Sequence, residues 1–97
     1  LYSQGDYEYL LSQLWRRRET DKNNRDLDHL IVDSYYNLGV LDLQRGDPAA
    51  ALGKFVEARK LEAGDPGLIR LERFARAYEA RGEDLLYRIF VKYLTVR

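Results

Sequence analysis

Apolar residues recur at steps of three and four along most of this chain. Between residues 25 and 45 these positions are Leu27, Leu30, Ile31, Tyr35 and Leu38. Between residues 66 and 81 they are Leu68, Leu71, Phe74, Ala75 and Tyr78. This spacing places apolar side chains on one face of a helix, and no window alternates with period two for long enough to form a strand. The sequence therefore predicts an all-α chain.

Proline and glycine indicate where the helices begin and end. Both prolines follow an aspartate, at Asp47-Pro48 and Asp65-Pro66, and this pair is typical of a helix start. Gly46, Gly64 and Gly82 follow helix-favouring runs, as left-handed C-terminal caps would. With a further break at DKNN (21–24), these signals predict five helices, near 6–20, 25–45, 48–63, 66–81 and 83–97.

A glycine followed by an acidic residue marks three positions between expected helices. These pairs are Gly5-Asp6, Gly46-Asp47 and Gly82-Glu83, at similar but unequal spacing. Recurring turns of this kind are typical of helical repeats. We therefore expect a series of antiparallel helix pairs with tight turns.

The stretch at about 32–65 resembles a tetratricopeptide repeat, a helix–turn–helix unit of about 34 residues, with degenerate repeats on either side of it. The matching positions are Tyr35, Leu38-Gly39, Gly46-Asp47, Ala51, Phe55 and Ala58. The resemblance implies that Gly39 and Ala51 face each other where the two helices cross. It also implies a single domain over residues 1–97, built as a short right-handed superhelix of about five helices. The chain begins at a leucine and contains no methionine, so we read it as a fragment of a longer protein.

Two departures from the family pattern affect the expected packing. Asp42 stands where the family usually has tyrosine, and Tyr87 occupies a small-residue position of a weaker repeat that begins at Leu68. A tyrosine does not fit a close helix crossing, so the last pair must open, shift register or end the array. The segment at 25–31 extends the first helix of the strong repeat, and we interpret it as simple elongation along the preceding helix rather than a docking feature.

Composition argues against several functional classes. Lysine plus arginine equals aspartate plus glutamate at 16 each, which disfavours nucleic-acid binding and membrane association. The absence of cysteine excludes thiolate chemistry, and His29 is the only histidine, interpreted as structural rather than catalytic. We expect no enzyme activity, cofactor, metal or membrane insertion. The compartment stays open, with a weak preference for the cytoplasm.

The resemblance implies a concave surface that binds a protein partner, either a peptide or a helix. Carried over by position, the partner-binding residues are Asp33, Tyr36, Val40, Leu43, Gln44, Ile69, Glu72, Arg76, Glu79 and Ala80. The mixture suits a peptide with apolar and basic groups. Tyr36 and Val40 stand where chaperone-binding members carry clamp residues for a terminal carboxylate, so we expect no such clamp.

The two ends of the chain carry more apolar residues than a terminal repeat helix needs. The residues of interest are Trp15, Leu86, Phe90, Tyr93 and Leu94. Either further repeats flank this piece or the ends associate with a second copy. The first hypothesis for function is therefore a non-catalytic interaction module, scaffold or adaptor. The alternative is a segment that forms a homodimer through its end helices, and a third is a regulatory appendage on an enzyme encoded elsewhere.

Overall fold

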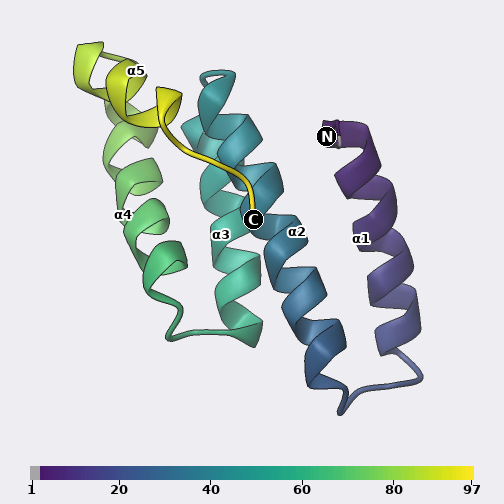
Figure 1. Cartoon of the computed structure of the whole chain (residues 1–97). Coiled ribbons are helices and arrows are strands. Elements are labelled where there is room, and N and C mark those ends of the chain that lie inside the picture. The colour runs from purple at the N-terminus through teal and green to yellow at the C-terminus, as the bar shows by residue number, and fades with distance from the viewer. Residues whose placement is uncertain (1–2) are drawn as a thin grey trace.

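The computed structural model describes residues 3–97, which form five α-helices and no strand. The helices are α1 (Gln4–Arg18), α2 (Arg25–Gln44), α3 (Pro48–Leu61), α4 (Pro66–Arg81) and α5 (Leu85–Lys92). α1 to α4 stand side by side and alternate in direction (Figure 1), and each packs against the next. The predicted all-α class and the predicted helix pairs are confirmed.

Short polar side chains start the helices as the sequence predicts. Asp47 and Asp65 are the N-caps of α3 and α4, and each carboxylate accepts a hydrogen bond from the backbone three residues later. Asp84 does the same for α5. Ser3 and Asp6 form a capping box at the start of α1. These bonds satisfy backbone N–H groups that have no partner within the helix.

Three expected boundaries are wrong. Gly5 lies inside α1, which begins at Gln4, because the capping box sets the start before the glycine. Gly46 and Gly82 have positive φ angles of 86° and 74°, as expected for left-handed glycines, but Gly64 does not. α5 ends at Lys92 rather than at residue 97, and residues 94–97 form no helix.

Two hydrophobic clusters hold the helices together. The larger cluster is built from α2, α3, α4 and α5, and Phe55, Leu71 and Tyr87 lie fully buried in it. The smaller one joins α1 to the first turns of α2 through Leu14, Leu27 and Ile31. The extended start of α2 therefore packs along α1, which confirms the interpretation as simple elongation.

Gly39 makes room on α2 for the ring of Phe55, which belongs to α3. A Cβ atom built at this position would lie 2.3 Å from Cε1 of Phe55 and 2.6 Å from Cζ. Because real Cβ contacts are longer than this, only glycine fits beside the ring. The expected close crossing is present, but the atoms nearest to Gly39 belong to the Phe55 ring rather than to Ala51.

Asp42 is fully buried and joins three helices. Its carboxylate accepts hydrogen bonds from Arg45 at 2.8 and 3.1 Å, from Lys54 on α3 at 2.9 Å, and from Gln4 on α1 at 3.1 Å. A buried carboxylate is stable only when it is paired and hydrogen-bonded in this way. Where the tetratricopeptide pattern expects a tyrosine ring, Asp42 thus forms hydrogen bonds that link α1, α2 and α3.

Candidate interaction groove

α5 does not lie alongside α4 as the second helix of a repeat pair would. It crosses the end of the stack (Figure 1), and it contacts α2. Tyr87 is fully buried, stacks on Phe74 with ring centroids 5.3 Å apart, and donates a hydrogen bond of 2.6 Å to the Leu43 carbonyl of α2. Burial raises the pKa of Tyr87 to about 12. The tyrosine is buried as α5 crosses the end of the stack (Figure 1), rather than in a close side-by-side crossing of α4 and α5.

The segment that follows α5 returns along α2. Figure 1 shows it, in yellow, running from α5 at the top to the middle of α2. We call residues 93–97 the C-terminal segment. Gln44, near the end of α2, donates hydrogen bonds to the carbonyls of Val91 at 3.2 Å and Leu94 at 3.1 Å. These bonds hold the point where the chain leaves α5.

Side chains of the C-terminal segment alternate between the core and solvent. Leu94 and Val96 are partly buried and pack against the larger hydrophobic cluster. Tyr93 and Thr95 are exposed. Alternation with period two is the pattern of an extended chain. Tyr93 still belongs to the turn that ends α5. The residues after it, 94–97, lie on the helices as an extended strip with one apolar edge (Figure 1).

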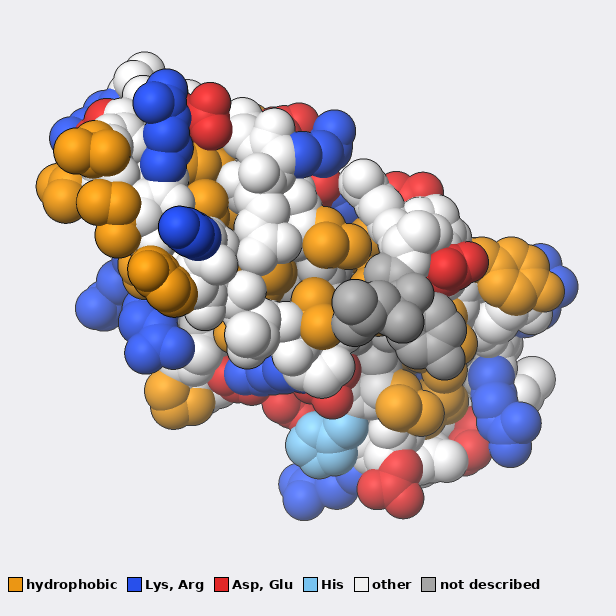
Figure 2. All heavy atoms as spheres, turned by 45° about the horizontal axis from the view of Figure 1, so that its top comes forward, with side chains coloured by type: hydrophobic (Ala, Val, Ile, Leu, Met, Phe, Trp, Pro, Cys, Tyr) orange, Lys and Arg blue, Asp and Glu red, His pale blue; other side chains and the backbone are white. Residues whose placement is uncertain are grey.

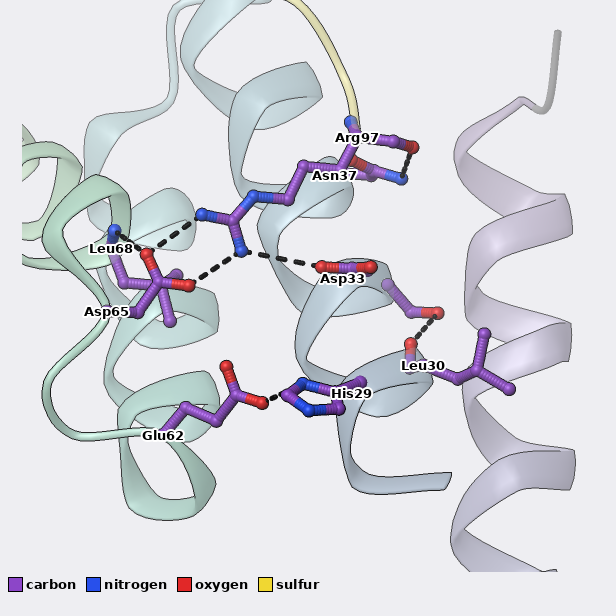
Figure 3. A network of polar contacts seen from close by, with 9 residues as sticks. His29, Leu30, Asp33, Asn37, Glu62, Asp65, Leu68 and Arg97 are labelled. Atoms are coloured by element: carbon purple, nitrogen blue, oxygen red, sulfur yellow. Dashed lines mark hydrogen bonds and ion pairs between the residues drawn. The ribbon is translucent and has the colours of Figure 1, made fainter. Parts of the chain in front are cut away.

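Asn37, in the middle of α2, holds the backbone of Arg97 from both sides. Its Oδ1 accepts a hydrogen bond of 2.6 Å from the Arg97 N–H, and its Nδ2 donates one of 3.2 Å to the Arg97 carbonyl. Figure 3 shows the amide and the backbone facing each other. Because both contacts are to main-chain atoms, they fix the position of an extended chain without selecting its side chain.

The guanidinium of Arg97 lies between α2 and the start of α4. It donates two hydrogen bonds of 2.8 Å to the two carboxylate oxygens of Asp65 and a longer one of 3.4 Å to Asp33. Its Cζ lies 4.0 Å from the centroid of the Tyr36 ring. Paired hydrogen bonds to a carboxylate and stacking on an aromatic face both match the planar fork of arginine.

Arg97 and Asp65 each stabilise the charged form of the other. The hydrogen bonds from Arg97 hold the pKa of Asp65 below its ordinary value of 3.8, and the backbone N–H of Leu68 contributes in the same direction. The hydrogen bonds to Asp65 raise the pKa of Arg97. Gly67 leaves room for the guanidinium, because a Cβ there would lie 2.8 Å from Nη2 of Arg97. Asp65 thus both caps α4 and binds the arginine.

The structure brings only part of the predicted partner-binding set together. Asp33, Tyr36 and Gln44 contact residues 91–97, as described above. Val40 and Leu43 are fully buried, so the expectation that they present a surface to a partner is corrected: they belong to the core that the end of the chain covers.

The predicted residues of α4 do not form one site. Glu72 pairs with Arg59 of α3 at 2.8 Å and lies 3.9 Å from Arg76. Ile69 is half-buried, and Glu79 and Ala80 are exposed. The carboxylate of Glu72 is thus engaged by the neighbouring α3 and by its own helix.

Sequence reasoning missed Asn37, Asp65 and Arg97. Asn37 stands four residues after Asp33, so the helical period already places it on the same face. Asp65 was interpreted only as a helix cap, and Arg97 was placed in a helix. The alternation of apolar and polar residues in YLTVR, residues 93–97, is the one local sign of an extended chain around Arg97. Five residues are too few for this pattern to exclude a helix.

The residues predicted for self-association differ in exposure. Leu86 is 69% exposed and Tyr93 75% exposed, whereas Phe90 and Leu94 are partly buried. Trp15 is partly buried against the smaller cluster, and its indole N–H donates to the Tyr35 hydroxyl at 2.9 Å. Leu85 and Ile89 add to the exposed apolar surface of α5, and Figure 2 shows orange side chains gathered at that end of the molecule.

His29 pairs with Glu62 across the α2–α3 interface (Figure 3). A hollow of about 270 Å³ beside it is lined by Arg25, Asp28, His29, Leu61 and Glu62. Within residues 3–97 no three or more histidine, cysteine or acidic side chains are grouped as metal ligands would be. In the same range no helix is both long and apolar enough to cross a membrane.

Comparison of the chain with protein-family models, curated proteins and solved structures finds no match. We call the surface on which residues 91–97 lie the α2/α4 groove, and we define it by the side chains that contact them, Asp33, Tyr36, Asn37, Gln44 and Asp65. Its interpretation therefore rests on these contacts alone.

Proposed function

We propose that the chain is a non-catalytic protein-interaction module that binds an extended segment of a partner in the α2/α4 groove. The observation that supports this proposal is the position of the C-terminal segment. An extended strip of the chain already lies on these helices, held by side chains that contact its backbone, its apolar edge and its terminal guanidinium.

The contacts to the backbone carry most of this argument. Asn37 bonds to one N–H and one carbonyl of the strip. Gln44 bonds to one carbonyl of the strip, that of Leu94, and to the Val91 carbonyl in the last turn of α5. Groups that pair with main-chain atoms are suited to hold segments of varied sequence in extended form.

The tetratricopeptide resemblance supports the same surface by a separate route. Asp33, Tyr36 and Gln44 were assigned to the concave face from their position in the repeat alone, and all three contact the returning end of the chain. We therefore propose a short array of tetratricopeptide type, with α2 and α3 as its best-formed unit. Scaffolding or adaptor roles follow from such a surface.

Selection of peptides from a random display library tests the proposal without assuming a partner. The targets are the chain itself and its Arg97→Ala variant, in which the C-terminal segment is held less firmly. Enriched peptides are then measured against Asn37→Leu, which keeps a similar volume but removes both backbone contacts. Lys60→Leu, at an exposed position of α3, is the matched control.

Groove binding predicts that enriched peptides lose at least tenfold in affinity for Asn37→Leu and bind Lys60→Leu as before. Peptides that bind both variants equally would place the interaction elsewhere. A selection that enriches no peptide at all would contradict the proposed function. Circular dichroism of each variant confirms that the helices are intact.

A homodimer through the end helices is a second candidate, favoured by the exposed face of α5. Leu85, Leu86, Ile89 and Tyr93 are between 49% and 75% exposed, and large apolar side chains that are exposed together often mark an interface. Light scattering over a range of concentrations tests this candidate. A mass that stays monomeric excludes it, and a dimer that Leu86→Glu dissociates supports it.

A further inference from the structure

The part of the groove that contacts Arg97 has its own chemistry. A carboxylate, an aromatic face and a second carboxylate surround one guanidinium, in the form of Asp65, Tyr36 and Asp33. Gly67 provides the space beside it, since any larger residue would meet Nη2. Among residues 3–97, Arg97 is the one cationic side chain that forms an ion pair with Asp33 or Asp65.

The apolar part of the groove lies at a fixed distance from the arginine along the strip. Val96 and Leu94 face the core, and Thr95 faces solvent. Asn37 sets this register, because it binds the backbone of the same residue whose side chain enters the acidic end. The groove therefore contacts an apolar residue, skips one, contacts a second apolar residue and then contacts an arginine.

From this arrangement we infer that the α2/α4 groove recognises extended segments of the pattern apolar–any–apolar–arginine, and that the chain's own residues 94–97 compete with them. This inference rests on the proposed function and adds to it the class of ligand and an internal competitor. A partner carrying such a segment binds by displacing the C-terminal segment, which releases Arg97 from Asp65.

Arginine is favoured over lysine by geometry. The two oxygens of Asp65 accept from two different nitrogens of one guanidinium, each at 2.8 Å, and an ammonium group offers only a single nitrogen. The Tyr36 face, 4.0 Å from Cζ, adds a stacking contact that a planar cation makes best. Glutamine in place of arginine loses the charge altogether.

The tethered segment has an advantage over any free peptide. A segment joined by a few residues to the fold has an effective concentration in the millimolar range. The apparent affinity of a free peptide falls by the fraction of molecules in which the groove is open. Removal of the Arg97 side chain, which weakens binding of the C-terminal segment, therefore raises the apparent affinity of the groove for a free peptide.

Fluorescence anisotropy with two labelled peptides tests the inference. The first peptide has the sequence of residues 93–97, YLTVR, and the second has glutamine in place of the arginine. Each is measured as a free acid and as an amide against the whole chain and against Arg97→Ala. We expect the arginine peptide to bind Arg97→Ala about tenfold more tightly than the unaltered chain, the factor that loss of one charge-assisted pair supplies.

A double-mutant cycle assigns the arginine to Asp65. In the Arg97→Ala background, Asp65→Asn keeps a good helix cap but removes the charge. It should weaken the arginine peptide about tenfold and the glutamine peptide less than twofold. The matched control is Asp47→Asn, the same change at the cap of α3, which should leave both peptides unaffected.

The outcomes separate this inference from the proposed function. Equal losses for both peptides on Asp65→Asn would overturn the arginine assignment. Equal affinity of the unaltered chain and Arg97→Ala would overturn the competition. Either result leaves the proposed function standing if the peptides selected from the display library still bind Asn37→Leu more weakly than the unaltered chain. A doubled mass of the unaltered chain that Arg97→Ala abolishes would show exchange of the segment between two copies and would also overturn competition within one chain.

Discussion

Replacement of Gly39 by alanine adds one methyl group where the Phe55 ring of α3 lies against the backbone of α2. The new Cβ would lie 2.3 Å from Cε1 of Phe55, and ordinary contact begins at 3.4 Å. The ring would have to move by about 1 Å to reach ordinary contact, yet Phe55 is fully buried. Overpacking of this kind costs about 1–3 kcal/mol, whereas alanine in place of glycine gains about 1 kcal/mol in helix propensity. We expect a net loss of up to about 2 kcal/mol, against a gain for alanine at a helix position without a clash.

Gly53 offers a matched control in the next helix. It lies within α3, and a Cβ there would have no heavy atom within 4 Å. Gly53→Ala therefore keeps the propensity gain without a clash and should stabilise the fold by up to about 1 kcal/mol. Urea or thermal unfolding followed by circular dichroism measures both variants. For a chain of this size, 1 kcal/mol corresponds to a shift of roughly 4–8 °C in Tm.

A second substitution separates the clash from other causes. Phe55→Leu in the Gly39→Ala background removes the atoms that the new methyl group meets, so the two changes should be less damaging together than their sum. If Gly39→Ala stabilises the fold as much as Gly53→Ala does, the close contact between α2 and α3 is not as the structure shows it.

Three further predictions concern the buried polar groups and the groove. Asp42→Asn should destabilise the fold by about 1.5–3 kcal/mol in urea unfolding, because a buried carboxylate that accepts bonds from two cations loses its charge. Tyr87→Phe should lower the free energy of unfolding by about 0.5–1.5 kcal/mol, because the hydrogen bond to the Leu43 carbonyl is lost. The pKa of Tyr87 is raised to about 12 in the folded protein, so its contribution to stability is complete below the ordinary tyrosine pKa of 10 and is lost as pH rises through 12. Spectrophotometric titration of the tyrosines detects this ionisation. Because the folded pKa of Asp65 is lowered, docking of Arg97 should persist above pH 3.8 and weaken as pH falls through the lowered value, and faster amide exchange in residues 94–97 would report it. Asp65→Asn should remove that acid step.

The positions of the first four helices could be predicted because local chemistry decides them. The Asp-Pro pairs cap α3 and α4 where the sequence places them. The apolar period of α2 correctly places Leu27, Ile31 and Leu38 on the buried face, but Leu30, assigned to the same face, is 53% exposed.

Gly39 was correctly interpreted as a close contact. The residue that faces Gly39 could not be predicted: Ala51 is expected, but the Phe55 ring lies there. The helical period shows on which face of a helix a residue lies, but not which side chain of the opposite helix packs against it.

The end of the chain could not be predicted in this way. Residues 83–97 are apolar around most of a helix, and nothing local shows that the helix ends at Lys92. Its path depends on Tyr87, which reaches Leu43, and on Gln44, which bonds to the carbonyls at the end of α5. These are contacts between residues more than 40 positions apart, and local sequence carries no signal for them.

The position of Tyr87 also explains why the candidate site differs from the one that the sequence predicts. The tetratricopeptide resemblance expects a small residue at position 87, and with it a helix that packs along α4. Tyr87 instead needs a deep pocket and a hydrogen-bond acceptor, and it finds both at the end of α2. α5 is thereby brought across α2, and the residues after it can only continue along that helix, toward Asn37 and Asp65. The tyrosine that breaks the repeat pattern is therefore what directs the C-terminal segment into the groove.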